Sequence, residues 1–111
     1  MKLVYLAHPY GGNVTNVYKS KIFVNYLNYN KIYPGVNIFN AVAYFFEYAQ
    51  LKTEAEIMAM CIDMLGRCDE LWLAPGWEDS PGCRAEIEYA TRTGMRVKYL
   101  VSIKGDTVCE D

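Results

Sequence analysis

Short apolar runs alternate along the chain with longer segments of helical periodicity. The runs at residues 2–7 (KLVYLA) and 71–74 (LWLA) are nearly continuous, which is typical of strands buried on both faces of a parallel sheet. Residues 36–39 and 95–103 predict two further strands, and the second of these is expected to be the last strand of the chain. Pro34 excludes a regular central strand through its own position.

Helices are predicted between these strands. Residues 14–30 carry a one-sided apolar pattern, and residues 41–51 (AVAYFFEYAQL) are aromatic and apolar. Residues 53–56 (TEAE) form a capping box, which starts a third helix. Ser80 and Pro81 are a good N-cap and first residue for a fourth helix, and Gly94 ends it.

The alternation of strands and helices predicts an α/β fold with right-handed crossovers. We expect a single three-layer Rossmann or flavodoxin-like domain over residues 1–111, with a small, mainly parallel sheet of about 4–5 strands. The content of 52% hydrophobic and 22% charged residues indicates a globular chain. The formal net charge of -2 argues against a nucleic-acid binder. Because the sequence has no signal-peptide pattern and no run long enough to span a bilayer, we expect a cytoplasmic protein without membrane contact.

The cysteine and tyrosine content bears on cofactors and partners. The four cysteines form no C-x-x-C pair and the chain has one histidine, which argues against a zinc site, so we expect no metal and no cofactor. Ten tyrosines suit subunit interfaces or ligand rims. Residues 44–48 (YFFEY) are too apolar for the surface of a small monomer, so we expect a homo-oligomer, a dimer or larger.

One carboxylate on the predicted fourth helix has no local partner. Glu88 has an arginine four residues away on either side, which marks it as an ion-pairing residue. Glu86 instead has glycine, cysteine, tyrosine and alanine at the corresponding helical spacings, and none of these can neutralise it. An exposed surface glutamate is one interpretation. The other is a nucleophile or base whose pKa is tuned by its surroundings.

Two loops follow the carboxyl ends of predicted strands, where open α/β sheets bind ligands. They are residues 8–13 and residues 75–80, and each leads into a helix N-terminus that favours an anion such as phosphate. The residues that we expect to bind a ligand are His8, Tyr10, Gly11, Gly12, Trp77, Asp79, Ser80 and Gly82.

Structural roles compete with chemical ones at three positions. Asp63 is a second carboxylate of interest, but Arg67 lies four residues later and could hold it in a surface ion pair. Tyr5 lies in a buried strand, which indicates core packing. His8 is the single histidine, and a satisfied loop histidine competes with a general base.

Four motifs, taken in order, resemble the nucleoside 2-deoxyribosyltransferase superfamily. They are V-Y-L-A-x-P near the start, a helical aspartate before a strand that begins C-D-E-L, a loop that ends D-S-P-G-C, and A-E-I-E-Y-A. The resemblance covers residues 2–100, and it is strongest to small phage and bacterial members, including the 2'-deoxynucleoside 5'-monophosphate N-hydrolase branch. It implies that Glu86 attacks the anomeric carbon of a sugar, that Tyr5 orients Glu86, and that Asp63 helps to protonate the departing base.

The resemblance also bears on the substrate. Ser80 occupies the position of an aspartate in the transferases and of a serine in the monophosphate hydrolases, which favours a phosphorylated ligand. The arginine that the hydrolase branch has in the first loop is missing here. Two functions therefore stay open. One is an enzyme that cleaves or transfers at the N-glycosidic bond of a (deoxy)nucleoside 5'-monophosphate. The other is a non-catalytic phage-type sponge that sequesters a nucleotide immune signal, such as a cyclic ADP-ribose derivative.

Overall fold

The computed structural model describes residues 1–29, 34–103 and 106–110. The predicted strands and three of the predicted helices are confirmed, with small shifts at their ends; residue 30, the last of the first predicted helix, lies outside the described residues. The helix predicted over residues 41–51 is shorter, since it is an α-helix only to Phe45 and then a 3-10 turn. In chain order the elements are β1 (Lys2–Ala7), α1 (Val14–Tyr29), β2 (Val36–Asn40), α2 (Ala41–Phe45), the 3-10 turn η1 (Phe46–Tyr48), α3 (Glu54–Leu65), β3 (Glu70–Leu73), the 3-10 turn η2 (Trp77–Asp79), α4 (Pro81–Thr93), β4 (Arg96–Ile103) and β5 (Asp106–Glu110).

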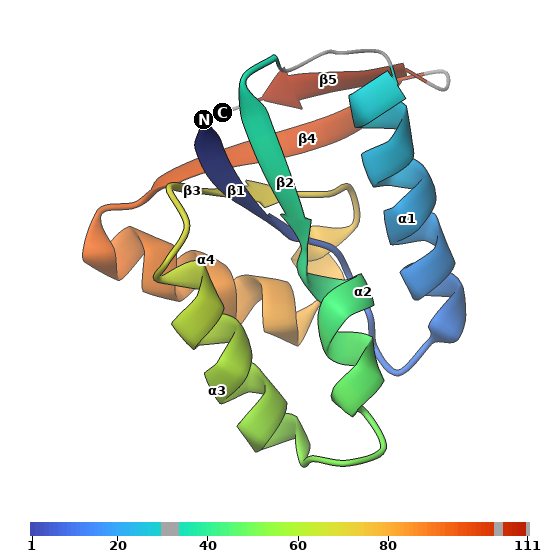
Figure 1. Cartoon of the computed structure of the whole chain (residues 1–111), viewed down its shortest axis with the longest axis vertical. Helices are drawn as coiled ribbons and strands as arrows, with labels where there is room; N and C mark the ends of the chain where they lie inside the picture. Colours follow the sequence, from blue (N-terminus) through green and yellow to red (C-terminus); the bar gives the residue numbers. More distant parts are fainter. Residues whose placement is uncertain (30–33, 104–105, 111) are drawn as a thin grey trace.

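The five strands form one sheet in the order β2-β1-β3-β4-β5 (Figure 1). The first four are parallel, and β5 runs antiparallel to β4. The prediction of a flavodoxin-like α/β domain with a mainly parallel sheet is confirmed. The prediction that residues 95–103 form the last strand is wrong, because β5 follows. The five residues of β5 (DTVCE) are mostly polar and have one neighbouring strand, so they lack the apolar run that marks a central strand.

Helices cover both faces of the sheet, as the alternation of side chains along β1 illustrates. Val4 and Leu6 point into a core shared with α1. Tyr5 and Ala7 point into the opposite core, which is shared with α2, α3 and α4. Figure 1 shows α1 on one side of the sheet and the other three helices on the opposite side. The sheet thus separates two cores, and the predicted site residue Tyr5 belongs to the larger of them.

The ends of α3 and α4 are set by the caps that the sequence predicts. Thr53 and Glu56 form the reciprocal capping box at the start of α3. Ser80 accepts a hydrogen bond of 3.2 Å from the backbone N–H of Cys83 at the start of α4. Gly94 ends α4 with φ of 76°, a left-handed conformation that glycine adopts without strain. These caps fix where each side chain of α4 points.

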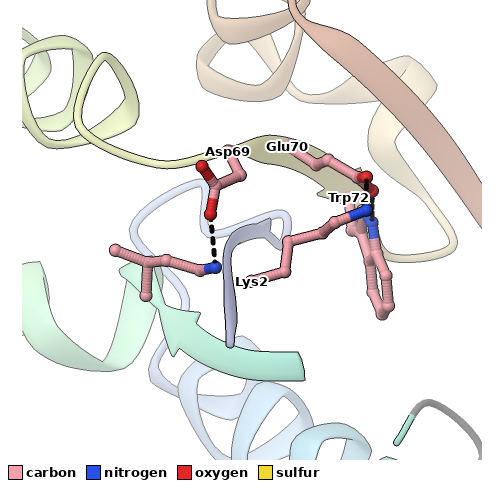
Figure 2. Close-up of polar contacts among 5 residues, drawn as sticks. Lys2, Asp69, Glu70 and Trp72 are labelled. Carbon is pink, nitrogen blue, oxygen red and sulfur yellow. Dashed lines mark hydrogen bonds and ion pairs between the residues drawn. The ribbon is translucent and has the colours of Figure 1, made fainter. Parts of the chain in front are cut away.

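A polar cluster ties the amino ends of β1 and β3 together (Figure 2). Glu70 is 3% exposed and accepts from the Lys2 ammonium at 2.6 Å and from the Trp72 indole N–H at 2.9 Å. Asp69 accepts from the backbone N–H of Leu3 at 2.7 Å. Burial raises the pKa of Glu70, but the hydrogen bonds from Lys2 and Trp72 lower it by more, so the pKa lies below its usual range. The sequence analysis gave Glu70 no role beyond the start of a strand.

The aromatic segment at residues 44–48 is only partly exposed. Phe45 is 6% exposed and belongs to the core between the sheet and its three helices, whereas Tyr44 is 51% exposed. Part of the segment is therefore covered within the chain, and its burial between subunits stays a prediction. Among the described residues, no helix has the length and apolar character to cross a bilayer.

Candidate active site

Tyr5 and Glu86 meet in the core beneath α4. The phenol hydroxyl of Tyr5, on β1, donates a hydrogen bond to Oε2 of Glu86, on α4. Tyr5 is 0% exposed and Glu86 is 6% exposed. The interpretation of Glu86 as an exposed surface glutamate is therefore excluded, and Tyr5 both packs in the core and orients this carboxyl.

The surroundings of Glu86 favour its neutral form. Burial raises the pKa of Glu86 to about 7, although the hydrogen bond from Tyr5 works against this shift. The pKa of Tyr5 is raised well above its usual range, first by burial and then by the charge of Glu86. Among the ion pairs of the described residues, none includes Glu86, whereas Glu88 contacts Arg92 at 3.6 Å. Glu86 is thus held by the hydrogen bond from Tyr5 but not by an ion pair, and its carboxyl titrates near neutral pH.

Two buried thiols stand near this pair. Cys61 of α3 interacts with Tyr5, and both Cys61 and Cys83 feel the charge of Glu86. Burial raises the pKa of Cys61 to about 11 and that of Cys83 to about 12, so both stay as neutral thiols at pH 7. They do not compete with Glu86 as nucleophiles. No pattern in the sequence points to the position of Cys61 beside Tyr5.

The loops after β1 and β3 lie side by side at the carboxyl edge of the sheet. The backbone N–H of Ala74 donates to the carbonyl of Ala7 at 2.9 Å. Gly76 has φ of 93°, and a Cβ on it would lie 3.5 Å from Cγ of Pro9. The structure therefore brings together the two loops that the sequence predicts to bind a ligand.

In the first loop, His8 is partly buried and its Nδ1 lies 2.8 Å from the Pro9 carbonyl oxygen. Burial lowers the pKa of His8, the Pro9 carbonyl partly offsets this, and the nearby Lys19 ammonium lowers it further. His8 is thus a satisfied, neutral loop histidine at pH 7. Tyr10 is partly buried, with its ring centroid 6.1 Å from that of Phe46.

The glycines of the first loop, Gly11 and Gly12, both have positive φ, at 58° and 75°. In the second loop, Trp77 packs on Tyr99 with ring centroids 5.0 Å apart, and Asp79 is exposed. These four residues of the predicted binding set lie in the two loops at the carboxyl edge of the sheet, and none of the hydrogen bonds of the described residues joins them to Glu86.

The start of α4 contributes the last two predicted binding residues. Ser80 is 8% exposed and acts as the N-cap described above. Gly82 faces α3, since a Cβ on it would lie 3.4 Å from Cε of Met58 and 4.0 Å from Oγ of Ser80. Ser80 lies six residues before Glu86 on the same helix, so α4 carries both the capping serine and the buried carboxyl.

Asp63 lies apart from this group. It is exposed on α3 and contacts Arg67 at 3.3 and 3.4 Å, which is the surface ion pair that the sequence analysis set against a chemical role. Residues two apart on a helix point in nearly opposite directions, so Asp63 faces away from the side on which Cys61 meets Tyr5. The structure thus joins Tyr5, Glu86 and the start of α4, but does not bring Asp63 to them. Among the described residues, no group of histidine, cysteine or acidic side chains could hold a metal ion.

The comparisons with known proteins agree with this fold. The profile of a family described as "Domain of unknown function (DUF4406)" matches residues 2–99. Among solved structures, the chain is similar to a 2-desoxiribosyltransferase from Leishmania mexicana, with a TM-score of 0.55 and 18% sequence identity over 89% of this chain. The chain spans 63% of the length of that protein. At this identity the similarity concerns the fold alone. No curated protein matches the chain.

Proposed function

The chain belongs to the DUF4406 family, and from its Tyr5–Glu86 pair we propose that it binds a nucleotide and cleaves or transfers at the N-glycosidic bond through Glu86. The substrate in this proposal is a (deoxy)nucleoside 5'-monophosphate. The single observation that carries the proposal is a buried carboxyl that a phenol orients and that forms no ion pair with any described residue. The deoxyribosyltransferase fold supports the same chemistry.

The reaction needs a nucleophile beside the anomeric carbon. In our proposal, ionised Glu86 forms a C–O bond to that carbon while the C–N bond to the base breaks and the base leaves with the electron pair. Water, or a second base, then attacks the glycosyl ester and frees Glu86. Tyr5 holds the attacking carboxyl in one rotamer and stabilises its charged form through the hydrogen bond that it donates.

The departing base needs a proton, and the resemblance assigns this role to Asp63. In the structure Asp63 pairs with Arg67 on the exposed side of α3. Our proposal therefore requires this ion pair to open, or the base to extend to α3, when the ligand binds. Exposed pairs of this kind contribute little free energy, so opening it is a small cost.

The 5'-phosphate is proposed to bind where α1 and α4 begin, since backbone N–H groups and the helix dipole favour an anion there. Ser80 supports this choice, because a serine does not repel a phosphate as a carboxylate would. We further propose that the protein works in the cytoplasm as a homo-oligomer.

A second candidate function is sequestration of a nucleotide-like signal without chemistry. Two observations favour it. The pKa of about 7 leaves a large share of Glu86 protonated, and therefore not nucleophilic, at neutral pH. Asp63 is held by Arg67 and is not in contact with Glu86.

One experiment separates the two functions. The protein is incubated with a panel of deoxynucleoside 5'-monophosphates and with cyclic ADP-ribose isomers, and the mixtures are chromatographed before and after heat denaturation. Release of free base indicates catalysis, whereas intact ligand released only after heating indicates sequestration. Glu86→Gln should lower the rate of base release by several orders of magnitude, and Glu88→Gln, on the same helix, should leave it unchanged. A loss of less than about tenfold in Glu86→Gln would refute the nucleophile.

A further inference from the structure

The outer face of α1 carries an uncovered apolar stripe. Val14, Tyr18 and Ile22 follow one another at intervals of four residues and are 48%, 63% and 68% exposed. Lys21 and Asn25 lie on the same face and are also exposed. We call these five residues the α1 stripe. A soluble chain of this size rarely leaves three large apolar side chains aligned in water without a partner.

A hollow of about 370 Å³ lies between α2 and α3, which Figure 1 shows next to each other. We call it the α2–α3 groove. Its wall is largely apolar, with a single carboxylate. The residues that line it are Tyr44, Phe45, Ala59, Met60, Asp63 and Met64. Methionine side chains adapt to the shape of an incoming apolar group, which suits a surface that receives another helix.

The two surfaces have opposite charge. Residues 14–29, which form α1, contain two lysines and no acidic residue. Residues 41–65 contain four acidic residues and one lysine, and Asp63 is the one charged residue among those that line the groove. Lys21 lies in the α1 stripe itself, and Asp63 lies in the groove with 68% of its side chain exposed despite its contact with Arg67.

We propose that the α1 stripe of one copy of this chain docks into the α2–α3 groove of a second copy, with Lys21 beside Asp63. Tyr18 and Ile22 would then cover Met60 and Met64. Because every copy carries both surfaces, two copies related by a two-fold axis would bury both pairs at once, and any other rotation continues head to tail into a ring or a filament. Pairing of two α1 stripes is the poorer choice, since it sets Lys21 against Lys21 and leaves both grooves open.

A charge exchange tests the contact. Lys21→Glu should weaken self-association at least about tenfold, because it places two like charges together. The double variant Lys21→Glu with Asp63→Lys should restore it. Lys19→Glu is the matched control, because Lys19 is exposed on α1 but lies about 160° around the helix from Lys21, and it should associate as the wild type does. Sedimentation at micromolar concentration measures all four proteins. A monomeric wild type, or a double variant no better than Lys21→Glu, overturns the proposal.

Cross-linking then identifies the facing surfaces. In a Cys109→Ser background, Ile22→Cys and Ala59→Cys are made as separate proteins with tags of different size, mixed, and oxidised. The expected product is a covalent pair that contains both tags, with Glu88→Cys, exposed on α4 and away from both surfaces, replacing Ile22→Cys as the control for random contact. A pair that forms equally well from Ile22→Cys alone shows α1–α1 contact and overturns the proposal. Neither readout depends on catalysis, so this inference and the proposed function fail independently.

Discussion

Replacing Glu86 by glutamine should make the protein more stable at alkaline pH. The carboxyl of Glu86 has a pKa of about 7 in the folded chain and 4.5 as an ordinary glutamate. Below the lower value both states hold the proton, and the folded chain has its full stability. As the pH rises toward 7 the unfolded chain loses this proton first, so the free energy of unfolding falls. Glutamine has the same shape, still accepts from Tyr5, and does not ionise.

The size of the effect follows from the shift in pKa. Each unit corresponds to about 1.4 kcal/mol, so a shift from 4.5 to about 7 lowers the free energy of unfolding by about 3 kcal/mol once the pH exceeds 7. For a domain of this size that is a large part of the total stability. The stability of Glu86→Gln relative to the wild type should therefore rise by about 3 kcal/mol between about pH 4 and about pH 8.

Urea unfolding at a series of pH values measures this difference by linear extrapolation. Groups that do not feel the charge of Glu86, such as Glu70, act equally in both proteins and cancel. Tyr5, Cys61 and Cys83 do feel that charge, but their pKa values are raised and they titrate above this pH range. Glu88→Gln is the control, because Glu88 is exposed and paired with Arg92. If the difference between Glu86→Gln and the wild type does not change with pH, then Glu86 is not desolvated and both the site and its chemistry lose their basis.

Two more predictions concern the partners of the buried carboxylates. Tyr5→Phe removes the hydroxyl that donates to Glu86, so the pKa of Glu86 should rise above about 7. An NMR titration of the carboxyl carbon measures this pKa, and an unchanged value would show that the hydrogen bond does not stabilise the ionised form. Lys2→Met removes the ammonium from Glu70 and should lower the free energy of unfolding by about 1–2 kcal/mol at neutral pH, a figure kept small because Lys2 is half exposed. Since the pKa of Glu70 is lowered in the folded chain, this loss should shrink as the pH falls through that pKa, and Lys52→Met should have no effect in the same urea titration.

The sequence predicts those features of the site that depend on residues close together along the chain. The helical spacing of charges around Glu86 showed that no neighbour neutralises it, and the alternation in the first strand placed Tyr5 in a core. Their contact joins residues 81 positions apart, so only the resemblance to a family suggested it, and only the folded chain displays it. The pair of Lys2 and Glu70 spans 68 positions and was missed for the same reason.

The elements of the fold were predicted where their signals are local. The caps at Thr53 and Ser80 each depend on a stretch of four residues, and both predicted helix starts are confirmed. The strand β5 has no comparable signal, because it is short, polar and pairs at the edge of the sheet. Asp63 shows the opposite limit. Its spacing to Arg67 predicted the ion pair that the structure contains, but the spacing is silent on what a bound ligand would do to it.

The phenol of Tyr5 also has a consequence for how β1 aligns with its neighbours. The run KLVYLA is apolar at almost every position, so its hydrophobicity alone would tolerate a strand register shifted by one residue. Such a shift would turn the Tyr5 hydroxyl toward Leu27 and Trp72 on the α1 side of the sheet. It would also leave Glu86, buried on the other side, without its hydrogen-bond donor. The hydrogen bond between Tyr5 and Glu86 can form in only one register of β1. The same two side chains therefore specify the strand register and form the candidate active site.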